Sequence, residues 1–99
     1  MNTQVSSHLS ESQQHFFILL EQYPTILRYW DSKERACDFI GLNNAYGVFS
    51  HGECVMAKFF VGLWRGQNEH QFDLFEAASV LDKEHRSIIS GWLKEPFWP

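Results

Sequence analysis

The sequence predicts an all-α fold, a single compact bundle of four or five helices around one mostly apolar central helix at about residues 51–65. Three observations predict it. Capping residues stand at the start of several segments, and apolar residues inside these segments recur three and four positions apart. The two strongest apolar stretches also lack the alternation that is typical of strands. We expect a flexible N-terminal segment (1–9) and one helical domain (10–99), because 99 residues with 44% hydrophobic content are enough for one core.

The first predicted helix begins at Ser10, since Gln13 stands at the capping-box position three residues later. One helical face then carries Phe16, Leu19, Leu20 and Tyr23. Pro24 ends this helix, because a proline disfavours helical geometry in the residue before it. A second helical turn over residues 25–30 follows, with Pro24 well suited to its first position.

A third helix is predicted to start at the cap Asp31, with Glu34 at the capping-box position. Its buried face would hold Ala36, Phe39 and Ile40. Gly41 is predicted to end this helix. We expect residues 41–47, with two glycines and an Asn pair, to form the main loop.

The central helix has the clearest start signal, the capping box formed by Ser50 and Glu53. Only one charged residue, Lys58, interrupts the apolar run over 54–64, so most sides of this helix are expected to be covered. Spacing at 100° per residue leaves one narrow strip for solvent, formed by His51, Cys54, Lys58, Gly62 and Arg65. Gly66 is predicted to end the helix.

Two further helices complete the predicted bundle. Asp73 and Glu76 repeat the capping-box spacing before the segment 74–81, whose apolar face carries Leu74, Ala77, Ala78 and Leu81. Asp82 caps a last helix that runs to Lys94. The apolar edge of this last helix consists of Ile88, Ile89, Trp92 and Leu93.

Charge and hydropathy argue against two classes of partner. The net charge is −4 and the eight Lys and Arg are scattered, whereas DNA-binding domains need a basic surface. Residues 36–42 resemble the start of a helix-turn-helix, but its second helix (43–50) would have no basic residue. The first apolar run, 16–20, is too short for a signal peptide or a membrane span. We therefore expect a cytoplasmic protein that binds neither nucleic acid nor membranes.

Few residues point to chemistry. His51 and Cys54 are weak metal candidates on one helical turn, where the helix start would lower the pKa of Cys54. A zinc site needs three or four ligands, and the remaining candidates (Cys37, His70, His85) stand on separate elements. Both cysteines are predicted to be helical and free. Only Asp38 and His85 are not explained as helix caps, and we expect His85 to be a core histidine with its nitrogens satisfied. We expect neither a catalytic residue nor a metal or cofactor.

The aromatic content is the strongest remaining signal, with nine Phe, four Trp and three Tyr. A core this small cannot easily bury sixteen aromatic side chains, and exposed aromatic residues are typical of protein interfaces. The candidates near helix ends, loops and the tail are Trp30, Tyr46, Trp64, Trp92, Phe97 and Trp98. We expect a non-enzymatic interaction module that forms a homodimer or binds another protein. The alternatives are a small enzyme or metal-binding protein that uses His51, Glu53 and Cys54, and a nucleic-acid-associated regulator.

Overall fold

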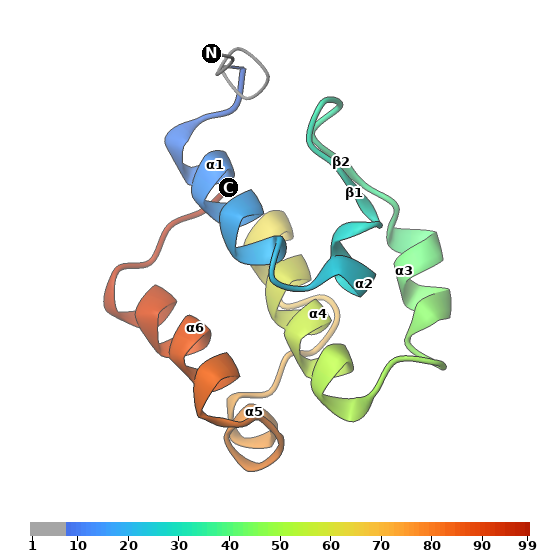
Figure 1. The fold of residues 1–99 in the computed structure, drawn as a ribbon, viewed down its shortest axis with the longest axis vertical. Helices are drawn as coiled ribbons and strands as arrows, with labels where there is room; N and C mark the ends of the chain where they lie inside the picture. Colours follow the sequence, from blue (N-terminus) through green and yellow to red (C-terminus); the bar gives the residue numbers. More distant parts are fainter. Residues whose placement is uncertain (1–7) are drawn as a thin grey trace. The chain divides into compact units, whose positions relative to one another are not determined.

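A computed structural model describes residues 8–99, which form six helices and one two-stranded hairpin (Figure 1). Residue contacts divide the chain into two units, residues up to Gly47 together with Pro99, and residues Val48–Trp98. Each unit is described by itself. The predicted flexible segment 1–9 falls mainly on residues 1–7, which lie outside the described residues. One helical domain over 10–99 stays a prediction.

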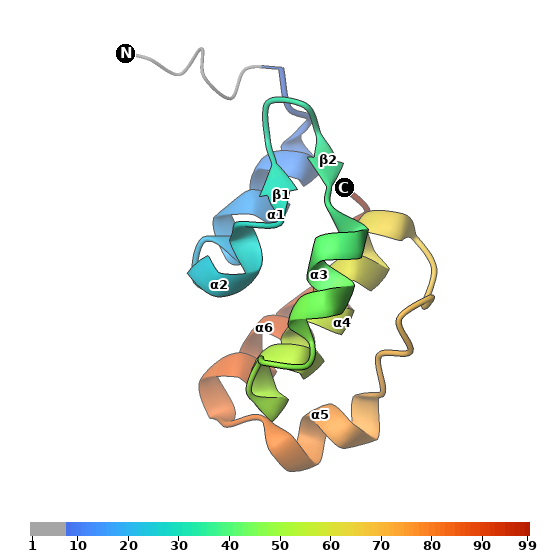
Figure 2. The ribbon, with the colours of Figure 1, turned by 90° about the vertical axis from the view of Figure 1, so that its right-hand side faces the viewer.

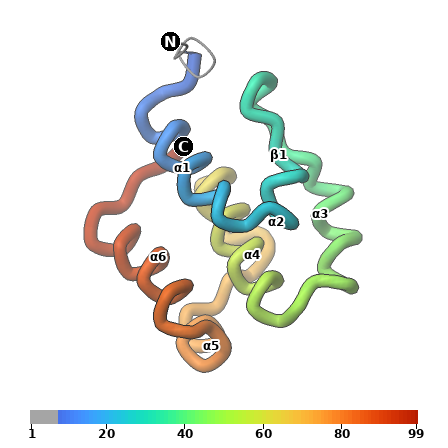
Figure 3. Tube along the Cα trace, in the orientation of Figure 1, coloured from blue at the N-terminus to red at the C-terminus, as the bar shows by residue number. Residues whose placement is uncertain are grey.

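The first unit begins with α1 (Glu11–Leu20) and α2 (Pro24–Leu27), which follow each other along the chain in Figure 3. The predicted capping box is confirmed, because Ser10 Oγ accepts from Gln13 N and the Gln13 side chain accepts from Ser10 N. Pro24 stands at the first position of α2, also as predicted. The fully buried side chains of these two helices are Phe16, Leu20 and Ile26.

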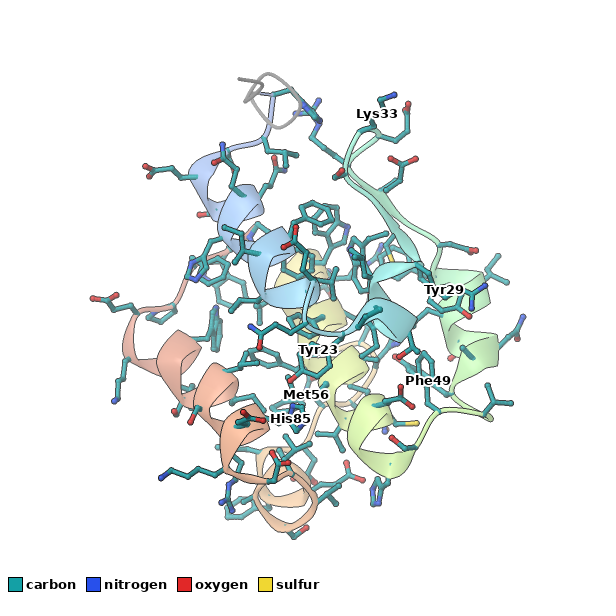
Figure 4. All side chains as sticks on the ribbon, viewed as in Figure 1. Tyr23, Tyr29, Lys33, Phe49, Met56 and His85 are labelled. Atoms are coloured by element: carbon teal, nitrogen blue, oxygen red, sulfur yellow. The ribbon has the colours of Figure 1, made fainter. Side chains whose placement is uncertain are left out.

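The described residues are mostly helical, as predicted, but residues 30–37 form a hairpin, so the predicted helix starting at Asp31 was wrong. Strand β1 (Trp30–Asp31) pairs antiparallel with β2 (Ala36–Cys37). The Asp31 carboxylate accepts from Lys33 N at 2.9 Å and from Glu34 N at 3.1 Å, which closes a turn. An aspartate satisfies backbone N–H groups in a turn as readily as at a helix start, and the sequence signal is the same for both. Lys33 lies at the tip of this hairpin (Figure 4), and Cys37 is in a strand rather than a helix.

Helix α3 (Phe39–Ala45) occupies most of the stretch that the sequence predicted as the main loop. Its cap is Asp38, whose carboxylate accepts from Gly41 N at 2.9 Å, so this residue has a structural role after all. Ile40, predicted to be buried, is 79% exposed. The helix-turn-helix does not form, because residues 36–37 are a strand and α3 ends at Ala45. Residues 8–99 therefore contain six helices rather than four or five, with α2 and α3 both short.

The second unit contains α4 (His51–Arg65), α5 (Leu74–Val80) and α6 (Lys83–Lys94). Figure 2 shows α5 after the long loop that leaves α4, leading directly into α6. The capping box of Ser50 and Glu53 is confirmed, and so is the helix end at Gly66, which has a φ of 69°. Helices α5 and α6 begin at the predicted caps Asp73 and Asp82.

Helix α4 supplies most of the buried side chains of the second unit. These are Val55, Met56, Ala57, Phe59, Phe60, Val61 and Leu63, and none belongs to the predicted solvent strip. Helix α4 contacts α5, and the Phe59 ring reaches Trp92 of α6 with centroids 5.8 Å apart. Within residues 8–99, no helix has the length and hydropathy needed to cross a membrane.

Candidate functional site: an apolar groove on α5 and α6

The second unit has a cavity of about 290 Å³ between its helices. Its walls come from α4, the loop after α4, α5, α6 and the C-terminal tail, with side chains that include Phe59, Phe72, Leu74, Ile89, Trp92 and Trp98. Polar side chains line it only at Gln67 and Asn68. A mostly apolar cavity with few polar groups is the usual form of a binding site.

A smaller cavity of about 180 Å³ adjoins the first one, since Leu74, Ile89 and Leu93 line both. Ala77, Ala78, Arg86 and Ser90 complete its lining. The small side chains of alanine and serine leave the hollow unfilled. We call the two cavities together the α5–α6 groove.

One wall of the groove is a row of aromatic rings in contact. The Phe59 ring lies 5.5 Å from that of Phe72 and 5.8 Å from that of Trp92, and Trp92 lies 5.2 Å from Trp98. The interplanar angles at Trp92 are 84° and 86°, the edge-to-face arrangement that aromatic pairs favour. Trp92 Nε1 also donates to the Phe97 carbonyl oxygen at 2.8 Å, which fixes the tail beside α6.

Large apolar side chains at this site remain in contact with solvent. Leu74 is 50% exposed, Leu93 51% and Trp98 58%. Phe75, the next residue after Leu74, is 87% exposed and lines neither cavity. Phe75 and Ala78 stand three positions apart on α5, so they share a side of that helix. The apolar surface therefore continues from the groove, across Ala78, to the Phe75 ring.

The groove has little charge. Among the described residues that line it, Arg86 alone carries a charge, and no carboxylate is present. Arg86 stands on the exposed side of α6. The groove thus offers an apolar floor with a single cation at one edge.

The predicted aromatic candidates lie in different environments. Trp30 is only 7% exposed and belongs to the core of the first unit, where its ring lies 5.6 Å from that of Phe16. Tyr46 follows α3 and is half-buried, as is Trp64 in the last turn of α4. The structure brings Trp92 and Trp98 together at the aromatic wall of the groove, and Phe97 joins them through its backbone carbonyl, which accepts from Trp92 Nε1.

None of the predicted strip residues on α4 is buried, and two of them, His51 and Arg65, contact carboxylates. His51 Nε2 lies 2.8 Å from Glu76 Oε2, and the Arg65 guanidinium makes two contacts of 3.0 and 3.1 Å with Glu69. Cys54, Lys58 and Gly62 are half-buried. Gly62 lines the larger cavity, which links this strip to the groove.

This geometry gives little support to a metal site or a reactive thiolate at His51, Glu53 and Cys54. Glu53 Oε1 accepts from Ser50 N at 2.9 Å, so its carboxylate completes the capping box. No three His, Cys, Asp or Glu side chains within residues 8–99 are grouped so that they could hold a metal ion. His85 lies 3.8 Å from Asp82 and is part-exposed rather than a buried core histidine.

The prediction that the helix start lowers the pKa of Cys54 was wrong. Burial raises this pKa above its ordinary value, because a charged thiolate loses solvation there. The carboxylates of Glu53 and Glu76 raise it further, and Lys58 opposes them without reversing the direction. Cys54 is therefore a thiol at neutral pH.

Alkylation of Cys54 by iodoacetamide should consequently be slower at pH 8 than that of a free cysteine. A raised pKa means that less thiolate is present at this pH, and the rate should keep rising beyond pH 9. The measurement is a pH–rate profile of a Cys37→Ser variant, with glutathione as the reference thiol. A rate plateau below pH 8 would contradict the raised pKa.

Sequence reasoning did not identify the exposed groove residues Leu74, Leu93 and Arg86, or the exposed Phe75 beside the groove. It placed Leu74 and Leu93 on the apolar faces of their helices. Phe75 carried a usable signal, because a large aromatic residue stood off the predicted apolar face of its helix.

No protein family model matches this chain, and neither a curated protein nor a solved structure shows significant similarity to it.

Proposed function

We propose that this protein is a non-enzymatic interaction module that associates with a second copy of itself through the α5–α6 groove. The observation that carries the proposal is the coincidence, in one unit, of an apolar groove with half-exposed Leu74, Leu93 and Trp98. Covering such side chains removes apolar area from water, which is the main favourable term in protein association. We also keep as a proposal that α4 is the central helix of the fold.

Neither alternative function is favoured by a specific observation. An enzyme or metal protein at His51, Glu53 and Cys54 would use side chains that already cap a helix, form an ion pair or are protonated. A nucleic-acid regulator would need a cationic surface, whereas the groove contributes one arginine.

Replacing Leu93 by aspartate is expected to weaken self-association by at least about 30-fold, since a charge at the centre of an apolar interface must be desolvated without a partner. Leu93 is already 51% exposed, so the fold should tolerate the change. The measurement is the mass in solution by light scattering across a concentration series, with circular dichroism as the check on folding.

Ile18→Asp is the matched control, because Ile18 is an exposed aliphatic residue (59%) on α1 of the first unit and lines neither cavity of the groove. It should associate like the wild type. A wild type that stays monomeric at all concentrations would refute the proposed function. Equal loss of association in both variants would place the interface elsewhere.

A further inference from the structure

We infer that the α5–α6 groove is one half of a self-complementary interface, in which the Phe75 ring of each of two copies enters the groove of the other beside Arg86. This inference rests on the proposed function and adds to it the side chains that meet. It explains two observations together, an unfilled apolar hollow and an aromatic ring that projects into solvent next to it.

Phe75 presents an exposed ring from a fixed backbone position. Its side chain is 87% exposed, while its backbone is held in place because the Asp73 carboxylate accepts from Phe75 N at 2.8 Å and Glu76 N at 3.1 Å. The ring therefore projects from a fixed point of α5. A preorganised anchor loses less conformational entropy when it binds than a mobile one.

The smaller cavity of the groove is the hollow that would receive the ring. The smaller cavity, about 180 Å³, is lined by Ala78 and Ser90, and the apolar walls of Leu74, Ile89 and Leu93 surround it. Phe75 of the same copy does not line this cavity. Ring and hollow are adjacent on one surface, which is the arrangement that a two-fold interface requires, since each copy presents both halves of the contact.

The charge in the groove also suits an aromatic ring. The face of an aromatic ring is its negative side, and the single charged residue of the groove, Arg86, is a cation. An incoming phenylalanine ring thus meets both an apolar floor and a guanidinium that it attracts. A cationic partner segment would be repelled at the same place.

The exposed apolar area near the groove can be compared with the area that a standard interface buries. The exposed parts of Phe75 (87%) and Trp98 (58%) amount to on the order of 300 Å². A standard interface buries about 800 Å² on each partner. The two rings supply roughly a third of the area that such an interface buries on each partner. The half-exposed Leu74 and Leu93, with the polar rim of α5 and α6, add to the area of the rings. These side chains thus form the apolar centre of an interface of that size, and polar residues around them supply the rim.

The test uses two complementary variants in the full chain. Phe75→Ala removes the ring, and Ala78→Trp fills the hollow, at an exposed position where the core is not disturbed. We expect each variant alone to dimerise at least about 30-fold more weakly than the wild type, the effect of losing a central aromatic anchor. An equimolar mixture should form heterodimers, because the Phe75 ring of one variant enters the open groove of the other. Native mass spectrometry distinguishes heterodimers from homodimers by mass.

Val48→Ala is the control, because Val48 is equally exposed (86%) and belongs to the same unit. It should dimerise like the wild type. Dimerisation of Phe75→Ala or of Ala78→Trp at wild-type strength would overturn the inference and leave the proposed function standing. Failure of the mixture to form heterodimers would also overturn it. A wild-type protein that never dimerises would refute both this inference and the proposed function.

Discussion

Replacing Phe60 by alanine is expected to lower the free energy of unfolding by about 3–5 kcal/mol. Phe60 is fully buried in α4, and its ring lies 5.5 Å from that of Phe59. Two contributions add up in this loss of stability. The buried apolar area of the ring is lost, and a cavity remains because neighbouring side chains relax only in part. For a chain of this size the midpoint of thermal unfolding should fall by about 12–40 °C.

Calorimetry or urea unfolding followed by circular dichroism measures this change. The matched control is Phe75→Ala, the same substitution at an 87% exposed position of the same unit. At protein concentrations low enough to exclude association, this control should change the free energy of unfolding by no more than about 0.5 kcal/mol. A loss below about 1 kcal/mol for Phe60→Ala would show that this ring is not packed as described.

Phe16→Ala is expected to cost about 3–5 kcal/mol in the first unit for the same physical reason. Phe16 is fully buried in α1, and its ring makes an edge contact with Phe17 at 5.4 Å and lies 5.6 Å from the Trp30 ring. Removal of the ring opens a cavity beside the Trp30 indole. Unfolding at lower urea concentration and altered tryptophan emission are the expected readouts.

Ile18→Ala on the same helix serves as the comparison, because Ile18 is 59% exposed. It should stay within about 0.5 kcal/mol of the wild type, apart from a small change in helix propensity. Equal destabilisation by both substitutions would mean that α1 buries a different face from the one described.

The sequence by itself determined where most helices of the described residues start, and where α4 ends. The boxes at Ser10 and Ser50, the caps Asp73 and Asp82, and the stop at Gly66 all stand where the sequence predicted them. These signals are reliable because a cap depends on atoms within three or four residues along the chain. Neither a neighbouring helix nor a distant segment is needed to satisfy them.

The tertiary structure decided what Asp31 and Asp38 do. The two side chains accept backbone N–H groups in similar local geometry, yet Asp31 closes a hairpin turn and Asp38 caps α3. A two-residue strand is stable only when its partner strand pairs with it, and the ladder between Trp30 and Cys37 joins residues seven positions apart. Local propensity therefore could not separate the hairpin from a helix.

The tertiary structure also decided which apolar side chains reach solvent. Helical spacing predicts that Leu74 and Leu93 belong to apolar faces, but it does not state how much of each face a neighbouring helix covers. Ala77 and Leu81 are buried, whereas Leu74 on the same predicted face is 50% exposed. The groove exists because α5 and α6 carry more apolar surface than α4 and the tail can cover. That balance depends on packing between elements and not on any local pattern.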